Sequence, residues 1–250
     1  MRYFFEIAYT GKNYAGWQSQ ANATGIQTVV EECLSKLFRQ PLKITGSGRT
    51  DTGVHCRQQF FHVDIDAAFD AETLILKLNS FLPSDIMIRT VRMVKAGAHA
   101  RYDATERTYE YYVTLAKDPF LDGFALRSFK IPELKTMNRA AALLVGVHDF
   151  ASFSKVKTDV NHFICEVKKA EWKKKGDLLV FTISANRFLR GMVRAVVGTL
   201  LEVGTGKISV NDFKAVLQSK DRRKAGANVA PGGLYLVKVK YPASLFLRKR

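Results

Sequence analysis

The order of the apolar patterns in the first hundred residues constrains the fold more than any other feature of the sequence. Alternating apolar side chains predict strands, and apolar side chains three and four residues apart predict helices. In chain order these rules predict strand, helix, two strands, helix and strand, at residues 2–9, 26–38, 42–44, 59–64, 71–82 and 86–94. This succession is the split βαβ order of a ferredoxin-like domain.

The second half of the chain repeats this order roughly. The predicted strands and helices fall at residues 107–113, 132–145, 162–172, 177–185, 188–203, 209–218 and 234–239, of which the second, fifth and sixth are helices. A chain of 250 residues has room for two domains of about 120. We therefore expect an α+β protein of two ferredoxin-like (RRM-like) halves, residues 1–102 and 103–250, whose mostly antiparallel sheets are joined around a central basic cleft.

Two local details of the predicted helices follow from the same patterns. Thr24 and Gln27 have the spacing of a capping box, so Thr24 is expected to cap the first helix. In the second helix, the apolar spacing is expected to turn one set of side chains inward, namely Leu74, Ile75, Leu78, Phe81 and Leu82.

Residues 46–56, GSGRTDTGVHC, carry the most distinctive chemistry. The run lies between an apolar segment and an alternating one, so it is expected to be a loop at the end of a strand, a common place for catalytic groups. Asp51 stands in its middle, and Arg49 favours the charged carboxylate, which could act as a nucleophile or a base. A tight turn capped by Asp51 would account for the same residues without chemistry, because Gly, Asp and Thr are common in turns.

A long polar loop, residues 10–25, precedes the first predicted helix. Long loops in compact domains are often functional. Its Tyr14 and Trp17, together with Lys12 and Gln18, would suit stacking on bases and contacts with phosphates. The alternative is that Trp17 packs in the core, because tryptophan is highly buried on average.

Arginines recur around the helix predicted at 188–203. Arg187, Arg190 and Arg194 would line up on its polar side, and Gly191 and Gly198 near them would let another molecule approach closely. A row of arginines without an acid is costly through self-repulsion, which favours a docked anion. An ordinary solvated helix face is the alternative.

The charge balance indicates a polyanionic partner. The net charge is +16, of which residues 1–102 contribute +3 and residues 103–250 contribute +13. Nucleic acid is the usual partner of such a surface. An anionic membrane would require a basic amphipathic helix with an aromatic face, and none stands out.

Several classes of protein are not favoured. The chain has no Gly-rich phosphate loop before a helix, no metal-ligand spacing, no apolar run of membrane-spanning length and no signal peptide at Met1–Glu6. Its three cysteines, Cys33, Cys56 and Cys165, lie far apart, which is typical of free thiols in a reducing compartment. A soluble cytoplasmic protein is expected.

The run Gly48–His55, GRTDTGVH, resembles the signature of the tRNA pseudouridine synthase A (TruA) family. Other segments are similar to that family in the same order along the chain: residues 9–18, 99–102, 107–109, 148–153, 186–198 and 230–235. Several motifs in the right order make a far more specific signal than any single one. Thr52 and Cys56 stand where the family usually has alanine, which bears on the fit of the RNA rather than on the reaction.

The resemblance implies an isomerase that converts uridine to pseudouridine on the 3′ side of the tRNA anticodon stem-loop, at positions 38, 39 and 40. It implies tRNA as the partner, no cofactor or metal, no membrane, and a homodimer. By position Asp51 matches the nucleophile, Arg194 the arginine paired with it, and Tyr109 the tyrosine that contacts the target base. Other residues expected to bind the substrate are Arg49, Arg101, Arg107, Arg190 and Trp17.

Two other functions fit parts of the sequence. A non-catalytic RNA-binding protein could use two ferredoxin-like sheets, but would have no use for a charged Asp51 beside arginines. A metal-dependent nuclease would need several convergent acids, whereas the loop offers only Asp51.

Overall fold

The computed structural model describes residues 1–155 and 160–247, which form two compact units. The first unit comprises Met1–Thr105 and the chain from Leu236 onward, and the second comprises Glu106–Tyr235. The expected boundary at residues 102 and 103 lies close to this division. The expected second half, 103–250, requires a correction, because its C-terminal segment belongs to the first unit.

Hydrogen bonds explain why the C-terminal segment belongs to the first unit. The Tyr241 hydroxyl donates to the Ala100 carbonyl at 2.6 Å, and the Leu247 amide donates to the Met93 carbonyl at 3.0 Å. The Tyr241 ring packs edge-on against Phe4, with 5.1 Å between ring centroids. Sequence patterns that are analysed separately for each half of the chain cannot predict this contact between aromatic side chains, because its two residues lie in different halves.

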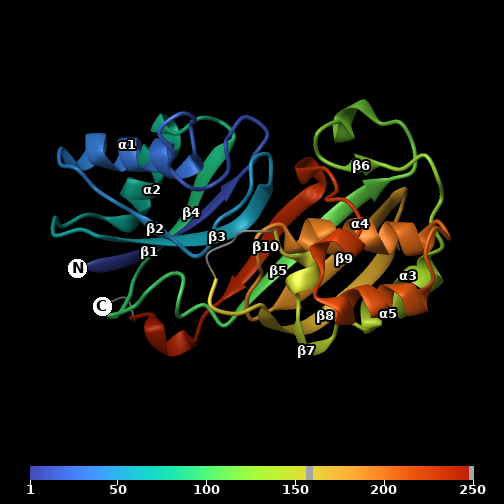
Figure 1. The fold of residues 1–250 in the computed structure, drawn as a ribbon. Coiled ribbons are helices and arrows are strands. Elements are labelled where there is room, and N and C mark those ends of the chain that lie inside the picture. The colour runs from blue at the N-terminus through green and yellow to red at the C-terminus, as the bar shows by residue number, and fades with distance from the viewer. Residues whose placement is uncertain (156–159, 248–250) are drawn as a thin grey trace. The chain divides into compact units, whose positions relative to one another are not determined.

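The first unit is an antiparallel sheet with two helices (Figure 1). Its elements are β1 (Arg2–Tyr9), α1 (Ile26–Phe38), β2 (Thr45–Gly46), β3 (His55–Asp64), α2 (Ala71–Phe81) and β4 (Ile86–Met93). The strand order is β4-β1-β3, with β2 paired to β3 and every pair antiparallel. Phe5 and Phe61 stack across β1 and β3, with 5.0 Å between ring centroids, and both side chains are fully buried.

Most of the first unit agrees with the sequence patterns, and three details are wrong. The strand expected at 42–44 is instead the two-residue β2, while Leu42 and Ile44 are buried without being in a strand. Helix α1 has Gly25 at its N-cap, and no side chain caps it. Phe81 is 63% exposed instead of inward.

The missing capping box has a steric cause. A Cβ at position 25 would lie 2.5 Å from the Gln18 carbonyl oxygen, so close packing requires glycine there. The Gln27 side chain, which a capping box would turn back to the helix start, is held elsewhere. Its Oε1 accepts from the Gln18 side-chain Nε2 at 2.8 Å, and its Nε2 donates to Glu31 Oε1 at 2.9 Å.

The second unit contains β5 (Glu106–Thr114), β6 (Leu126–Arg127), α3 (Leu134–Ala142), β7 (Gly146–Asp149), β8 (Ile164–Lys175), β9 (Leu178–Ala185), α4 (Met192–Gly204) and α5 (Val210–Ser219). Its strands run in the order β5-β9-β8-β7, all antiparallel, and β6 pairs with β5 in parallel. The strand β10 (Leu234–Lys240) begins in this unit and continues into the first, where it pairs with β3.

Alternation and turn chemistry predicted most strands and helices of the second unit, but not β6 and β7. The lysine run is predicted to be a hairpin tip, but Lys173–Lys175 form the end of β8 and pair with β9. The turn itself is formed by the next two residues, and Gly176 takes the left-handed φ of 60° there. Ser209 caps α5 with a full capping box to Asp212. Short 3-10 helices occur at Pro119–Leu121, Ala151–Phe153, Arg222–Lys224, Pro231–Gly233 and Ala243–Leu245.

The described residues also test the expectations about membrane-spanning segments and cysteines. None of their helices combines the length and apolar character needed to cross a membrane. Cys33, Cys56 and Cys165 are all buried free thiols, as their spacing in the sequence predicts. Burial raises the pKa of the Cys165 thiol to about 11.

Candidate active site

The Asp51 loop, residues 46–56, joins β2 to β3 in the first unit and presents its acid from a tight turn. The Val54 amide donates to the Asp51 carbonyl at 3.1 Å, and Gly53 has a φ of 78° inside this turn. Asp51 is half-buried, whereas Thr50 and Val54 on either side are buried. The loop is therefore anchored through the neighbours of Asp51, while Asp51 itself is only partly buried.

A buried polar network ties this loop to the sheet below it. The Tyr9 hydroxyl donates to Gln59 Oε1 at 3.0 Å and lies 2.9 Å from Thr50 Oγ1, so the Thr50 hydroxyl is the donor in that second bond. Gln59 Nε2 in turn donates to the Gly48 carbonyl at 3.1 Å. Since satisfied buried networks hold one geometry, these residues fix the backbone on both sides of Arg49 and Asp51.

The loop at residues 10–25 supports the Asp51 loop through backbone contacts. The Trp17 amide donates to the Thr50 carbonyl and the Gly53 amide donates to the Tyr14 carbonyl, both at 3.3 Å. Gly16 makes this approach possible, because a Cβ there would lie 2.3 Å from the Thr50 carbonyl oxygen and its φ is 85°. The two loops thus form one packed assembly.

The expected base-stacking role of Trp17 is wrong. The side chain is 1% exposed, and its indole lies against Gly46, where a Cβ would approach Trp17 Nε1 to 2.4 Å. Tyr14 is also buried, and its hydroxyl donates to Asp85 Oδ1 at 2.6 Å. Both aromatic residues therefore stabilise the loops from inside, which corresponds to the alternative that the sequence left open for Trp17.

Arg101, expected to bind substrate, lies in the first unit on an exposed turn at residues 99–103. The turn is organised around His99, whose Nδ1 accepts from the Arg101 and Tyr102 amides at 3.1 and 3.3 Å. Below it His62, in β3, accepts from the Ala100 amide at 3.1 Å. The Arg101 guanidinium extends over the Tyr102 ring, 5.7 Å from its centroid.

Burial lowers the pKa of His62 to about 4, and the Arg2 and His99 charges act in the same direction against the smaller opposing effect of Asp64 and Asp103. An unfolded histidine titrates near pH 6.5, so the unfolded chain binds a proton that folded His62 refuses between pH 6.5 and 4. The folded state therefore loses stability as the pH falls through this window, by roughly 3 kcal/mol at its lower end.

We predict that His62→Asn removes most of this pH dependence. An asparagine oxygen can accept from the Ala100 amide but does not titrate. Between about pH 7 and 4.5 the urea-unfolding free energy of the wild type should fall by roughly 2–3 kcal/mol more than that of the variant. Parallel curves for the two proteins over this range would contradict the assignment of the effect to His62.

In the second unit, Tyr109 and Arg107 lie on β5 two residues apart and share one face. The Tyr109 ring packs edge-on against Phe188, with 4.9 Å between centroids and 83° between planes. Arg107 Nη1 donates to the Asn186 carbonyl at 3.0 Å. The segment after β9 thus positions both predicted site residues.

The predicted arginine row on one helix face is wrong. Helix α4 begins at Met192, and Gly191 at its N-cap has a φ of 74° that breaks the helical path. Arg187 and Arg190 therefore precede the helix. Arg190 is exposed in this turn, and Arg187 Nη1 lies 3.2 Å from His162 Nε2.

Arg194 lies in the first turn of α4 and is held by the segment 226–229. Its Nε donates to the Val229 carbonyl at 2.7 Å, and the Val229 amide donates to the Arg194 carbonyl at 3.3 Å. The expected role of Gly198 changes accordingly. A Cβ at Gly198 would lie 2.0 Å from the Ala227 carbonyl oxygen, so this glycine admits the protein's own chain and not a ligand.

The structure also places one buried phenol near Arg194. Burial raises the pKa of Tyr111, and the Arg194 charge opposes this effect. The Tyr111 hydroxyl donates to the Ala230 carbonyl at 2.8 Å, so it is a structural group. Tyr109, two residues earlier on the same strand, is only half-buried.

The candidate site residues divide between the units. The first unit carries Asp51, Arg49, Arg101 and Trp17, and the second carries Tyr109, Arg107, Arg190 and Arg194. Sequence reasoning missed the supporting residues Tyr9, Gln59 and Phe188. The sequence does contain a signal for Gln59, because it is a polar residue beside the apolar pair at 60–61 of a predicted strand. No sequence signal indicates the long-range hydrogen-bond partners of Tyr9.

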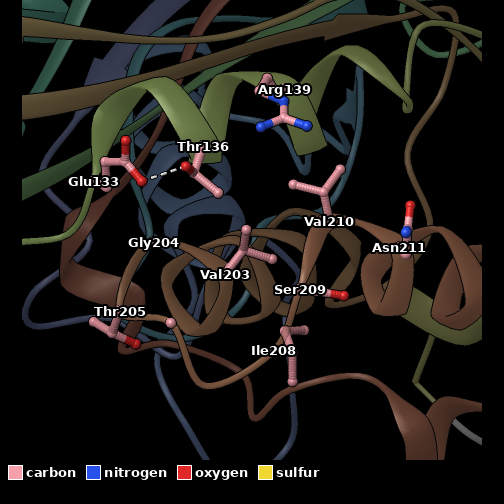
Figure 2. A pocket seen from close by; sticks show the side chains of 11 residues that line it. Glu133, Thr136, Arg139, Val203, Gly204, Thr205, Ile208, Ser209, Val210 and Asn211 are labelled. Carbon is pink, nitrogen blue, oxygen red and sulfur yellow. Dashed lines mark hydrogen bonds between the residues drawn. The ribbon is translucent and has the colours of Figure 1, made fainter.

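A hollow of about 640 Å³ lies in the second unit, between the start of α3, the end of α4 and the start of α5. Figure 2 shows the side chains that line it. Thr136 donates a hydrogen bond to Glu133 at its rim, and Arg139 extends from α3 beside Val210. None of the predicted site residues lines this hollow. Among the described residues no group of three His, Cys, Asp or Glu side chains is placed to hold a metal ion.

Comparison with known proteins identifies the family. Residues 7–103 and 140–242 match the family described as tRNA pseudouridine synthase. The chain is 48% identical to tRNA pseudouridine synthase A of Porphyromonas gingivalis, over 98% of this chain and 99% of that protein. It is 47% identical to the protein of the same name from Bacteroides thetaiotaomicron, covering 98% and 92% of the two chains. The enzyme of that name from Chlorobaculum tepidum is 38% identical, over 94% and 96%.

The matched ranges include the Asp51 loop, the turn at 99–103 and the start of α4. The match covers well over half of the chain, and the relatives are similar over nearly their full length. The chain therefore belongs to the tRNA pseudouridine synthase family and is an isomerase that forms pseudouridine in tRNA.

Proposed function

We propose that this protein isomerises uridine to pseudouridine at positions 38, 39 and 40 of the tRNA anticodon stem-loop. The observation that carries the proposal is the position of Asp51, which is only partly buried and is held by buried neighbours on a loop packed between Gly16 and the β1–β3 sheet. A single anchored acid is what an isomerisation requires, because no redox equivalent or phosphate donor is consumed.

In the proposed reaction Asp51 is the nucleophile, which attacks the sugar or the base or assists formation of a glycal. The bond from the sugar C1′ to uracil N1 breaks, the base turns, and a bond from C1′ to C5 forms. Any bond that Asp51 has formed to the sugar or the base breaks before the product leaves, which restores the carboxylate. The C5 proton must also leave while N1 gains a proton, and the phenol oxygen of Tyr109 is proposed to contact the base and accept the C5 proton. Arg194 is proposed as the guanidinium that pairs with Asp51, and the Val229 carbonyl orients its Nε.

The uridine of a folded stem-loop must be flipped out before it reacts. Unstacking costs a few kcal/mol, which phosphate contacts from a basic surface can offset. We propose Arg49, Arg101, Arg107 and Arg190 for substrate contacts, and the net charge of +16 supports an RNA partner. Trp17 leaves this set because it is buried.

The proposal includes the wider organisation of the protein. Both halves are proposed to be ferredoxin-like, supported in the first unit by the order β4-β1-β3-β2 with antiparallel pairs and two helices. The protein is proposed to act as a homodimer in the cytoplasm without a cofactor. Sedimentation analysis of the purified protein tests the dimer directly, and a monomer at micromolar concentration would contradict it.

Incubation with unmodified tRNA transcripts tests the proposed activity. Carbodiimide treatment followed by primer extension marks pseudouridine as a stop one nucleotide before the modified base. Stops are expected at positions 38, 39 and 40 wherever the transcript has uridine there. Stops confined to other parts of the tRNA would overturn the site assignment, and their complete absence would overturn the proposed activity.

We predict that Arg190→Gln weakens tRNA binding and reduces its salt dependence. Arg190 is exposed in the turn before α4, so its charge is available to a phosphate. Loss of one phosphate contact should lower the slope of log K against log salt by about one. Filter binding from about 50 to 300 mM salt measures this slope.

Arg223→Gln is the matched control for Arg190→Gln. Arg223 is equally exposed, but its guanidinium is paired with Asp221 at 2.8 Å, so it offers less charge to RNA. Its slope should match that of the wild type. If Arg190→Gln also keeps the wild-type slope, Arg190 does not contact the phosphate backbone.

A further inference from the structure

Tyr102 is an unusual surface residue because it is exposed and rigidly supported at once. Its side chain is 75% exposed, on the turn that joins β4 to β5. The ring stacks on His99, with 4.3 Å between centroids and 36° between planes. His99 in turn packs edge-on against the buried His62 at 4.8 Å. Three rings therefore lead from the core of the first unit to its surface.

Hydrogen bonds fix this set of rings in place. The His99 amide donates to Asp103 Oδ2 at 2.7 Å, and the Asp103 amide donates back to the His99 carbonyl at 3.1 Å. His99 Nδ1 accepts from the Arg101 and Tyr102 amides. The turn is thus held both from its ends and through the imidazole, so the Tyr102 ring loses little conformational entropy when it is covered.

A positive charge lies close to the Tyr102 ring. The Arg101 guanidinium lies 5.7 Å from the Tyr102 centroid. An exposed aromatic ring beside a guanidinium is the combination that proteins use to stack an unpaired base, because the ring covers the face of the base and the cation suits the adjacent phosphate. An aromatic ring that stays exposed to water adds little hydrophobic stabilisation to the folded monomer.

We infer that Tyr102 is a stacking platform for an unpaired nucleobase of the tRNA substrate, with His99 as the residue that positions it. The inference rests on the proposed function, since it assumes an RNA substrate, and it adds a binding residue outside the Asp51 loop. The chemistry that it would recognise is the face of a base, so it should be insensitive to base identity. It should require a nucleotide that is free of Watson–Crick pairing.

The test compares Tyr102→Ala with Tyr102→Phe in equilibrium binding to an unmodified tRNA transcript and to a fully paired RNA duplex of similar length. Loss of the ring should raise the Kd for tRNA roughly tenfold or more. Tyr102→Phe keeps the ring and should bind within about twofold of the wild type. Affinity for the duplex, which offers no unpaired base, should be the same for all three proteins.

Phe81→Ala is the matched control, because Phe81 is another exposed aromatic residue of the same unit, at the end of α2. It should leave the Kd for tRNA unchanged. Urea unfolding of Tyr102→Ala checks that the turn stays folded. Should the fold be disturbed, Arg101→Gln supplies a second variant, which should weaken tRNA binding while the ring remains.

Three outcomes would overturn the inference: wild-type affinity of Tyr102→Ala for tRNA, an equal loss for tRNA and duplex, or an equal loss in Tyr102→Phe. The binding readout needs no turnover, so these results are separate from the carbodiimide mapping. Pseudouridine at 38–40 with unchanged binding of Tyr102→Ala would reject the stacking platform alone. Absence of pseudouridine would reject the proposed activity.

Discussion

Replacing Asp51 by asparagine is expected to abolish isomerisation while tRNA binding persists. The amide has nearly the shape of the carboxylate, so the turn from Asp51 to Val54 should be preserved. Removal of a nucleophile should lower the turnover rate by roughly four orders of magnitude or more. Affinity for tRNA should be unchanged or slightly higher, because one negative charge near the phosphates is removed. Tritium release from tRNA labelled at uridine C5 measures the reaction, and filter binding measures the affinity.

Asp66→Asn provides the matched control for Asp51→Asn. Asp66 lies in the same unit, is almost fully exposed and pairs with the terminal ammonium of Met1, so the turnover of this variant should equal that of the wild type. If Asp51→Asn released tritium within about tenfold of the wild-type rate, Asp51 would not be the nucleophile. If it instead lost tRNA binding, its role would lie in the complex rather than in the chemistry.

The order of strands and helices was predictable because each depends on local patterns. The alternation in residues 2–9 and 107–113 predicts strands without reference to the rest of the chain, and Gly176 marks the hairpin turn between β8 and β9. The return of the C-terminal segment to the first unit was not predictable in this way. It depends on the hydrogen bond from Tyr241 to Ala100, a contact between residues 141 positions apart.

The turn that carries Asp51 could be predicted from the sequence, whereas the placement of the arginines could not. The glycines around Asp51 predict a tight turn, and the structure has this turn, with Gly53 at a left-handed φ. The helical arginine row assumed that the helix ran unbroken from residue 188. One backbone angle at Gly191 removes Arg187 and Arg190 from that helix, and a glycine alone does not reveal its φ in the sequence.

Burial was the other quantity that the sequence could not fix. An exposed aromatic residue in a polar loop has the same sequence signature as a buried one, and here Trp17 is buried while Tyr102 is exposed. The difference is set by distant partners. Gly46 leaves space for the Trp17 indole, whereas the Tyr102 ring packs against His99 and remains 75% exposed. Functional assignment of aromatic residues therefore required the structure.

Gly16→Ala is expected to damage both stability and turnover, although residue 16 touches no substrate in the proposed reaction. The new Cβ would lie 2.3 Å from the Thr50 carbonyl oxygen, and the φ of 85° is unfavourable for any residue with a Cβ. We expect the free energy of unfolding to fall by about 2–4 kcal/mol. Since either loop must move to relieve the overlap, the displaced Asp51 should lower kcat by roughly 100-fold.

Gly48→Ala is the control for the stability measurement, because Gly48 lies in the Asp51 loop, a Cβ added there would meet no atom within 4 Å, and its φ is not left-handed. Its unfolding free energy should stay within about 0.5 kcal/mol of the wild type. A Gly16→Ala protein that is destabilised yet keeps the wild-type kcat would show that Asp51 does not depend on the loop at residues 10–25 for its position. A loss of kcat that persists at a temperature where the variant is fully folded would instead establish that dependence, because unfolding could no longer account for it.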